Sequence, residues 1–455
     1  MVTEPIQAIR DEEHDTAYDL DLRRALRDMA ALPPSPEAPY LSVSLDWRPA
    51  GEEPGRATAP EPKRSQRRSP DGDRGPSRRP ARQQIAEELE ALVDSLGPRG
   101  TAFDSASADA ARILAFLDDE LDPAAHGVFV VACDARGVFT PLTLGLPVPT
   151  GLASGPTPAL GSLARLADDH PTYAVLLADQ RDATLFLIDQ TVARQSVTIE
   201  GTDHPRKQQQ GGWSQRRYQA RADERLAAFA RGTAEEVQRT LDDEAIAMLI
   251  VAGDEVITTA LDAEFHQTVK ERILDTIHLD IRATESDVIA ATLPIVERAE
   301  REREAATVSA LRDAVGAGGQ GAAGAEDTLT ALQAGQVATL VMTDDFAAPG
   351  WADFVLPVYG VGDLPAEHPA GGDGANLIPV ALAEELIRLT LDTGGDVQIV
   401  RTAVPVEEAI AGGEIPESGS PPPRTEAAHA LDALGGVGAL LRFILDEDQP
   451  VAEMS

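Results

Sequence analysis

Most of the residues that could do chemistry lie in one short stretch: a glycine pair followed by aromatic, hydroxyl, amide and basic side chains, namely Gly211, Gly212, Trp213, Ser214, Gln215, Arg216, Arg217 and Tyr218. Paired glycines accept positive φ angles and let backbone amides approach a ligand closely. Arginines neutralise phosphates and stack on bases. Arg206, Lys207 and Arg221 extend the basic character on both sides. These residue types favour contact with RNA.

Other catalytic arrangements have little support. Ser214 with His204 would suggest nucleophilic hydrolysis, but no acidic residue in the sequence orients that histidine. The eight histidines are scattered without ligand spacing, so we expect no metal site. There is no phosphate-binding loop, and we expect no cofactor. The single cysteine, Cys133, excludes an intramolecular disulfide and lies in an apolar run typical of a buried strand.

The net charge of -37 argues against general nucleic-acid binding, because contact with phosphates requires lysine and arginine. Two basic segments interrupt this acidic composition. Residues 56–82 hold nine basic and three acidic residues, and residues 203–225 hold six basic and three acidic ones. We therefore predict that any RNA contact is local, and we expect no DNA partner.

The elements that must position the glycine pair follow from hydrophobic periodicity. Residues 172–178 read as a buried strand and 183–200 as a hairpin, and a polar loop then runs from Gly201 to about Arg216. A long helical pattern continues to Asp243, and a buried strand follows at 246–251. Strands alternating with helices indicate an α/β fold with several domains.

The rest of the chain reads similarly. Helices are expected at 16–31, 83–96, 106–121, 158–168, 286–315, 326–334, 376–392 and 425–433, and strands at 40–45, 127–133, 137–144, 277–282, 336–343, 396–402 and 438–445. Residues 49–82 are rich in Pro, Gly and Arg, which predicts a solvated, disordered insertion. We expect an N-terminal α/β domain (1–170), a middle domain (171–300) and a C-terminal α/β domain (316–455).

Three segments, in order, resemble the archaeo-eukaryotic class 1 release factor superfamily. Residues 173–187, followed by the glycine pair and a long helix, are similar to its RNase H-like middle domain. Residues 324–341, and then 394–400 with 434–443, are similar to the opening and closing parts of its third, α/β/α domain. Residues 1–170 do not resemble the codon-reading domain. The arrangement therefore resembles the bacterial and archaeal branch of the superfamily, and within it bacterial family 10.

This resemblance implies work on the ribosome. In release factors, a Gly-Gly-Gln loop enters the peptidyl-transferase centre, where the glutamine positions the water that hydrolyses peptidyl-tRNA. Here Trp213 stands where that glutamine would be, and Gln215 is two residues further on. Some divergent relatives use a shifted glutamine. By that analogy Gln215 carries hydrolysis, with Gly211, Gly212 and Ser214 around it.

Two functional readings stay open. In the first, the protein frees nascent chains from stalled ribosomes by hydrolysing peptidyl-tRNA. In the second, it occupies the ribosomal A site without chemistry, as a hibernation or protection factor, and the Trp213 substitution favours this reading. A third and weaker reading is an RNA-binding protein with no ribosomal role. Gly318, Gly319 and Gln320 form a literal Gly-Gly-Gln, but they follow a helix and read as a flexible linker between domains.

The expected partners are the ribosome, through its RNA and peptidyl-tRNA, and a protein that binds the C-terminal domain. No stretch approaches the ~20 apolar residues of a membrane-spanning helix, so no membrane partner is expected. The acidic start of the chain lacks the features of a signal peptide. We therefore expect a cytoplasmic protein.

Overall fold

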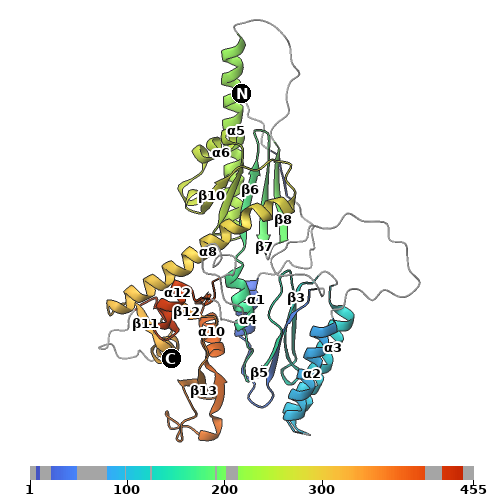
Figure 1. The fold of residues 1–455 in the computed structure, drawn as a ribbon, viewed down its shortest axis with the longest axis vertical. Helices are drawn as coiled ribbons and strands as arrows, with labels where there is room; N and C mark the ends of the chain where they lie inside the picture. The colour runs from blue at the N-terminus through green and yellow to red at the C-terminus, as the bar shows by residue number, and fades with distance from the viewer. Residues whose placement is uncertain are drawn as a thin grey trace, which may run out of the picture. The chain divides into compact units, whose positions relative to one another are not determined.

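The computed structural model describes residues 7–10, 22–48, 79–97, 99–122, 125–189, 192–200, 214–404 and 423–443. Contacts divide the chain into two compact units. Unit 1 comprises residues 1–18, 52–72 and 170–300, and unit 2 comprises 19–51, 73–169 and 301–455. Each unit is built from helices packed on sheets, which confirms the predicted multi-domain α/β class (Figure 1). The division into three domains stays a prediction.

Unit 1 contains one six-stranded sheet in the order β1-β8-β7-β6-β9-β10. The strands are β1 (Gln7–Arg10), β6 (Tyr173–Ala178), β7 (Asp182–Asp189), β8 (Val192–Glu200), β9 (Leu249–Gly253) and β10 (Ile273–Ile277). β6, β7, β8 and β1 pair antiparallel, whereas β9 runs parallel to β6 and β10 runs parallel to β9. From β6 to β10, numbered 1 to 5 in chain order, the spatial order is 3-2-1-4-5.

Alternation along β6 divides the core of unit 1 between the two faces of the sheet. Ala174 and Leu176 face the helices α5 (Ser214–Asp243), α6 (Glu255–Glu264) and α7 (Gln267–Lys270). Tyr173 and Val175 face the first half of α8 (Glu285–Gly316). Both faces are therefore covered, as the uninterrupted apolar runs of β6 and β9 predict.

The N-terminal part of unit 2 has an antiparallel sheet in the order β4-β3-β2-β5. Its strands are β2 (Tyr40–Asp46), β3 (Gly127–Cys133), β4 (Val138–Leu144) and β5 (Gly151–Gly155). One face is covered by α2 (Arg79–Ser95), α3 (Thr101–Ala115) and a π-helical turn, η1 (Phe116–Glu120). A 3-10 turn, η2 (Asp134–Arg136), joins β3 to β4. The predicted buried cysteine, Cys133, is fully buried on the other face.

The C-terminal part of unit 2 has a second sheet in the order β11-β17-β12-β16. Its strands are β11 (Gly321–Ala323), β12 (Val337–Thr343), β16 (Asp396–Val400) and β17 (Val437–Leu441). One face packs on α9 (Gly324–Gln333), α10 (Leu382–Asp392) and two helices from earlier in the chain, α1 (Leu22–Ala30) and α4 (Gly161–Asp169). The other face packs on the second half of α8 and on α12 (Glu426–Asp432). A single apolar cluster therefore joins α1 and α4 to the C-terminal sheet.

Several elements differ from the sequence predictions. The strand expected at 277–282 is β10, at Ile273–Ile277, and the apolar side chains of Leu279 and Ile281 pack on the core from a loop instead. β5 was not predicted. Nor was a small sheet of β14 (Val358–Val361), β13 (Pro349–Asp353) and β15 (Ile378–Ala381), which is followed by α10 and contains a 3-10 turn, η3 (Gly374–Asn376). Most of the predicted insertion at 49–82 lies outside the described residues, and its last residues begin α2.

Candidate functional site

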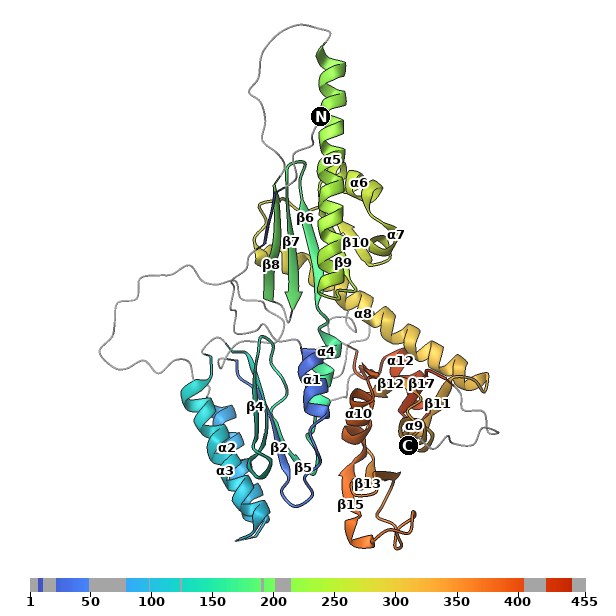
Figure 2. The ribbon, with the colours of Figure 1, turned by 180° about the vertical axis from the view of Figure 1, so that it is seen from behind.

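Helix α5 is the scaffold of the candidate site. Its 30 residues span about 45 Å at 1.5 Å per residue. Its described apolar contacts with the sheet begin at Leu226 and continue through Phe229, Ala230, Val237 and Leu241. Residues 214–225 precede these contacts, and the helix continues past the ends of the strands in both views (Figures 1 and 2). The sheet thus holds the C-terminal part of α5 and leaves its N-terminal part projecting.

The apolar face of α5, rather than its ion pairs, fixes the helix. Arg231 contacts Glu264 of α6 with Nε–Oε2 at 3.0 Å, and Arg272 contacts Asp242 with Nη2–Oδ1 at 2.8 Å. Both pairs are largely exposed, and exposed pairs contribute about 0–1 kcal/mol each. Burial of Phe229 and Leu241 against the sheet is the larger contribution, since burying one such side chain stabilises by about 1.5–3 kcal/mol.

Strand topology places both ends of the segment between β8 and α5 at the same end of the sheet. β8 ends at Glu200, which pairs with Asp182 at the start of β7. α5 ends at Asp243 and leads into β9, whose first residue lies beside Ala174 near the start of β6. Because α5 returns along the sheet toward the start of β6, its first residues lie toward the opposite end, where β8 ends. Glu200 and the first residues of α5 therefore both lie toward the end of the sheet where β7 begins.

The structure divides the predicted site residues into two groups. Arg206, Lys207, Gly211, Gly212 and Trp213 lie outside the described residues. The other six occupy the first two turns of α5, where the structure describes the backbone alone; they are Ser214, Gln215, Arg216, Arg217, Tyr218 and Arg221. The loop expected to reach Arg216 is therefore shorter than predicted, because the helix already begins at Ser214.

Helical spacing separates the basic positions of α5 from its buried face. Arg217, Arg221 and Arg225 recur at intervals of four residues, so these positions share one side of the helix. Position 221 precedes the buried Ala230 by nine residues, or 2.5 turns, and thus lies opposite the face that packs on the sheet. Position 215 is about four full turns before Ala230 and falls on the same side as the buried residues. The glutamine and the arginine row therefore occupy different sides of α5.

The literal Gly-Gly-Gln at 318–320 is ordered, and its prediction as a flexible linker was wrong. Gly318 has φ +61°, and its N–H donates to the carbonyl of Val315 at the end of α8. The carbonyl of Gln320 accepts a hydrogen bond from the backbone N–H of Leu441 at 3.0 Å. This segment therefore ends α8 and leads directly into β11.

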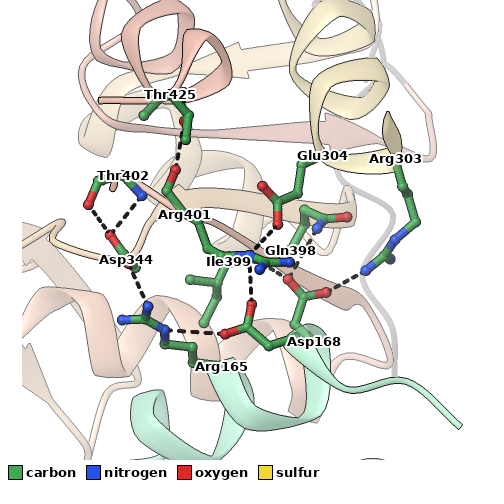
Figure 3. A network of polar contacts seen from close by, with 12 residues as sticks. Arg165, Asp168, Arg303, Glu304, Asp344, Gln398, Ile399, Arg401, Thr402 and Thr425 are labelled. Carbon is green, nitrogen blue, oxygen red and sulfur yellow. Dashed lines mark hydrogen bonds and ion pairs between the residues drawn. The ribbon is translucent and has the colours of Figure 1, made fainter. Parts of the chain in front are cut away.

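A buried ion cluster in unit 2 was not found by sequence reasoning (Figure 3). Its centre is Asp168, at the end of α4, whose side chain is 4% exposed. Oδ1 accepts from Arg303 Nη2 of α8 at 2.8 Å. Oδ2 accepts from the side-chain amide of Gln398 at 3.1 Å and from the backbone N–H of Ile399 at 2.7 Å. One carboxylate thus joins α4, α8 and β16.

Further charged residues extend the cluster around Asp168. Arg401 Nε lies 3.2 Å from Glu304 Oε1 and 3.3 Å from Asp169 Oδ1. Arg165 Nη2 lies 2.9 Å from Asp344 Oδ2. Burial raises the pKa of Asp168 and of Glu304, and this effect outweighs the lowering by Arg303 and Arg401. Sequence reasoning missed this cluster because a lone acidic residue near the end of a helix usually lies on a solvated surface.

No other described cluster suggests a reactive centre. Among the described residues, no group of three or more His, Cys, Asp or Glu could hold a metal ion. Asp353 and His368 form a buried pair, with Oδ2–Nε2 at 2.9 Å, and Asp353 also accepts backbone hydrogen bonds from Val355 and Leu356. This pair holds a turn next to β13. In the described part of the chain, no helix is long and apolar enough to cross a membrane.

The middle of the chain is similar to a known protein family. Residues 158–297, which contain α5 and strands β6 to β10 of unit 1, match the model of the "Bacterial archaeo-eukaryotic release factor family 10". A comparison with curated proteins finds no match.

Among solved structures, the archaeal translation termination factor aRF1 matches with 13% identity and a TM-score of 0.24, over 93% of this chain and 97% of that one. Dom34 of S. cerevisiae matches with 12% identity and a TM-score of 0.37, over 70% and 81%. Ribosome-bound archaeal Pelota, described together with ABCE1, matches with 16% identity and a TM-score of 0.36, over 70% and 78%.

TM-scores below 0.5 carry no argument about function, so the family match bears the assignment. The matched residues include the first of the three segments on which the resemblance rests. Residues 158–297 of the chain are therefore similar to bacterial archaeo-eukaryotic release factor family 10.

Proposed function

We propose that the protein binds the ribosome and inserts the Gly211-Gly212 loop near the peptidyl-transferase centre, where it promotes hydrolysis of peptidyl-tRNA in ribosome rescue. The observation that carries this proposal is the projection of α5 from a sheet that belongs to a release-factor family. A helix anchored only at its C-terminal part can deliver its N-terminal end into a narrow site that a whole domain could not enter.

The distribution of charge supports an RNA-facing end of α5. Four arginines lie between Arg216 and Arg225, against two acidic residues, Asp223 and Glu224. The remainder of α5, residues 226–243, carries two arginines and four acidic residues. Because the protein as a whole is strongly acidic, phosphate repulsion disfavours most other surfaces. Among the described helices and strands of unit 1, the projecting end of α5 is therefore the part best suited to ribosomal RNA.

The proposed chemistry is attack by water on the ester that joins the peptide to tRNA. A bond forms between the water oxygen and the carbonyl carbon, the bond to the ribose oxygen breaks, and that oxygen takes a proton to become the tRNA hydroxyl. Gln215 positions the water, and backbone amides beside Gly211 and Gly212 stabilise the developing oxyanion. Arginine side chains, with Trp213 and Tyr218, hold the surrounding RNA.

A second function is favoured by a specific observation. Trp213 stands where release factors have their glutamine, and a bulky indole suits stacking on a base better than positioning of water. In this alternative the protein occupies the A site without chemistry, as a hibernation or protection factor. A protein partner on residues 316–455 is proposed for either function.

A peptidyl-tRNA release assay on stalled ribosomes separates the two functions. Hydrolysis predicts that the wild-type protein releases the nascent chain, that Gln215→Ala does not, and that both co-sediment equally with ribosomes. The control is Gln219→Ala, one helical turn further along α5. Saturable binding without release would support the non-catalytic function. Failure of the wild-type protein to co-sediment at moderate salt would refute both.

A further inference from the structure

Within the described residues, the chain passes between the units at two points, Asp169 to His170 and Glu300 to Arg301. The second of these lies inside α8, which is continuous from Glu285 to Gly316. The buried ion cluster of Figure 3 lies on the unit 2 side of both points.

Two sets of contacts join residues beside the first crossing, on α4, to residues beside the second crossing, on α8. The direct tie is the 2.8 Å contact between Asp168, two residues before the first crossing, and Arg303, three residues after the second. The indirect tie is Arg401, whose Nε lies 3.3 Å from Asp169 and 3.2 Å from Glu304. Consecutive residues of α4 are thus joined to consecutive residues of α8.

The carboxylate of Asp168 also holds the end of α4 against the edge strand β16. β16 is the last strand of its sheet, so one side of it has no neighbouring strand. Asp168 accepts the backbone N–H of Ile399 on that strand, and α4 thereby covers the edge. Removing the carboxylate would leave the buried N–H of Ile399 without its acceptor and would break the contact with Arg303, which is unfavourable.

We infer that this cluster is a clamp that keeps the two crossings paired on unit 2. Separating them requires the unpairing of buried charges. Motion of unit 1 must therefore bend the chain outside the clamp, at residues 170–172 or in α8 before Arg301. The inference does not depend on the proposed function, because it concerns the free protein.

Native-state hydrogen exchange of the full chain tests the clamp. In Asp168→Ala we expect exchange to speed up by about tenfold or more at amides 301–306 of α8, as well as near the substituted residue. The control is Asp396→Ala, on the same strand β16, which removes an exposed ion pair with Arg27. It should leave amides 301–306 unchanged.

The decisive observation is whether a substitution beside one crossing speeds hydrogen exchange at amides beside the other crossing. A clamp predicts that Asp168→Ala loosens residues 301–306 and that Arg303→Gln loosens residues 166–172. If each substitution speeds exchange only around its own position, the cluster merely fills a sheet edge and the inference is overturned. If Asp168→Ala does not fold, Asp168→Asn keeps an oxygen acceptor for Ile399 while removing the charge, and the same criterion applies to it.

Discussion

Asp109 offers a sharp test of the electrostatics of unit 2. It lies on α3 and is 3% exposed. Its Oδ2 accepts hydrogen bonds from the backbone N–H of Asp134 at 3.1 Å and from the hydroxyl of Ser105 at 3.2 Å. The Ser105 oxygen in turn accepts from the N–H of Ala135 at 3.0 Å. The carboxylate thus ties the start of η2 to α3.

Burial raises the pKa of Asp109 from 3.8 to about 6, although its two hydrogen bonds lower it, and the charge of Asp134 adds to the rise. The folded protein therefore binds the proton more tightly than the unfolded chain does. The stability associated with this group is fully present below pH 3.8 and is lost as the pH rises toward 6. A shift of this size corresponds to about 3 kcal/mol in full, which we reduce to about 1–2 kcal/mol for screening by solvent.

The substitution Asp109→Asn removes this titration and keeps an oxygen that can accept both hydrogen bonds. We expect the variant to be more stable than wild type by about 1–2 kcal/mol at about pH 7.5, with the difference falling toward zero near pH 4. Urea unfolding at a series of pH values measures it, with the fluorescence of Trp47 as a local probe, because this side chain packs in the same core as α3.

The control is Asp119→Asn on η1, which removes one negative charge from an exposed position. It separates the local effect from a general reduction of the large net negative charge. The reasoning would be refuted if the stability difference between Asp109→Asn and wild type did not change between about pH 4.5 and 7.5, or if wild type were the more stable of the two at the higher pH.

Two further predictions concern α5. Phe229→Ala should cost unit 1 about 3–5 kcal/mol, because it opens a cavity between helix and sheet, and a smaller loss in thermal or urea unfolding would contradict the assigned anchor. Charge reversal of Arg216 and Arg217 to Glu should weaken ribosome association by at least about tenfold at moderate salt, whereas reversal of the adjacent pair Arg67 and Arg68 should change it little. Equal effects of the two reversals in co-sedimentation would argue against the end of α5 as the contact.

Local pattern was sufficient to predict β6, β7 and the long helix of unit 1. β6 is buried along its whole length and β7 at most of its positions, and the long helix ends at Asp243 as predicted. The start of α5 was placed too late because Ser214 and Gln215 read as polar loop residues. Glutamine and arginine favour helices, so the helix already begins at Ser214, before Arg216.

Long-range contacts explain what could not be predicted. Asp168, Arg303 and Arg401 are separated by about a hundred residues or more, and no periodicity brings such residues together. The small sheet of β13, β14 and β15 consists of short strands, and Gly350 and Pro379 lie within them. Glycine and proline usually predict turns, so these strands become recognisable only through their pairing.

The most direct test of the central claim is a cryo-electron microscopy map of the protein bound to a ribosome that carries peptidyl-tRNA. We predict that the N-terminal end of α5 enters the peptidyl-transferase centre, with Gln215 close to the ester and the arginine row of α5 against ribosomal RNA. Density showing that end of α5 away from the peptidyl-transferase centre, or unit 1 bound through another surface, would contradict the proposed function.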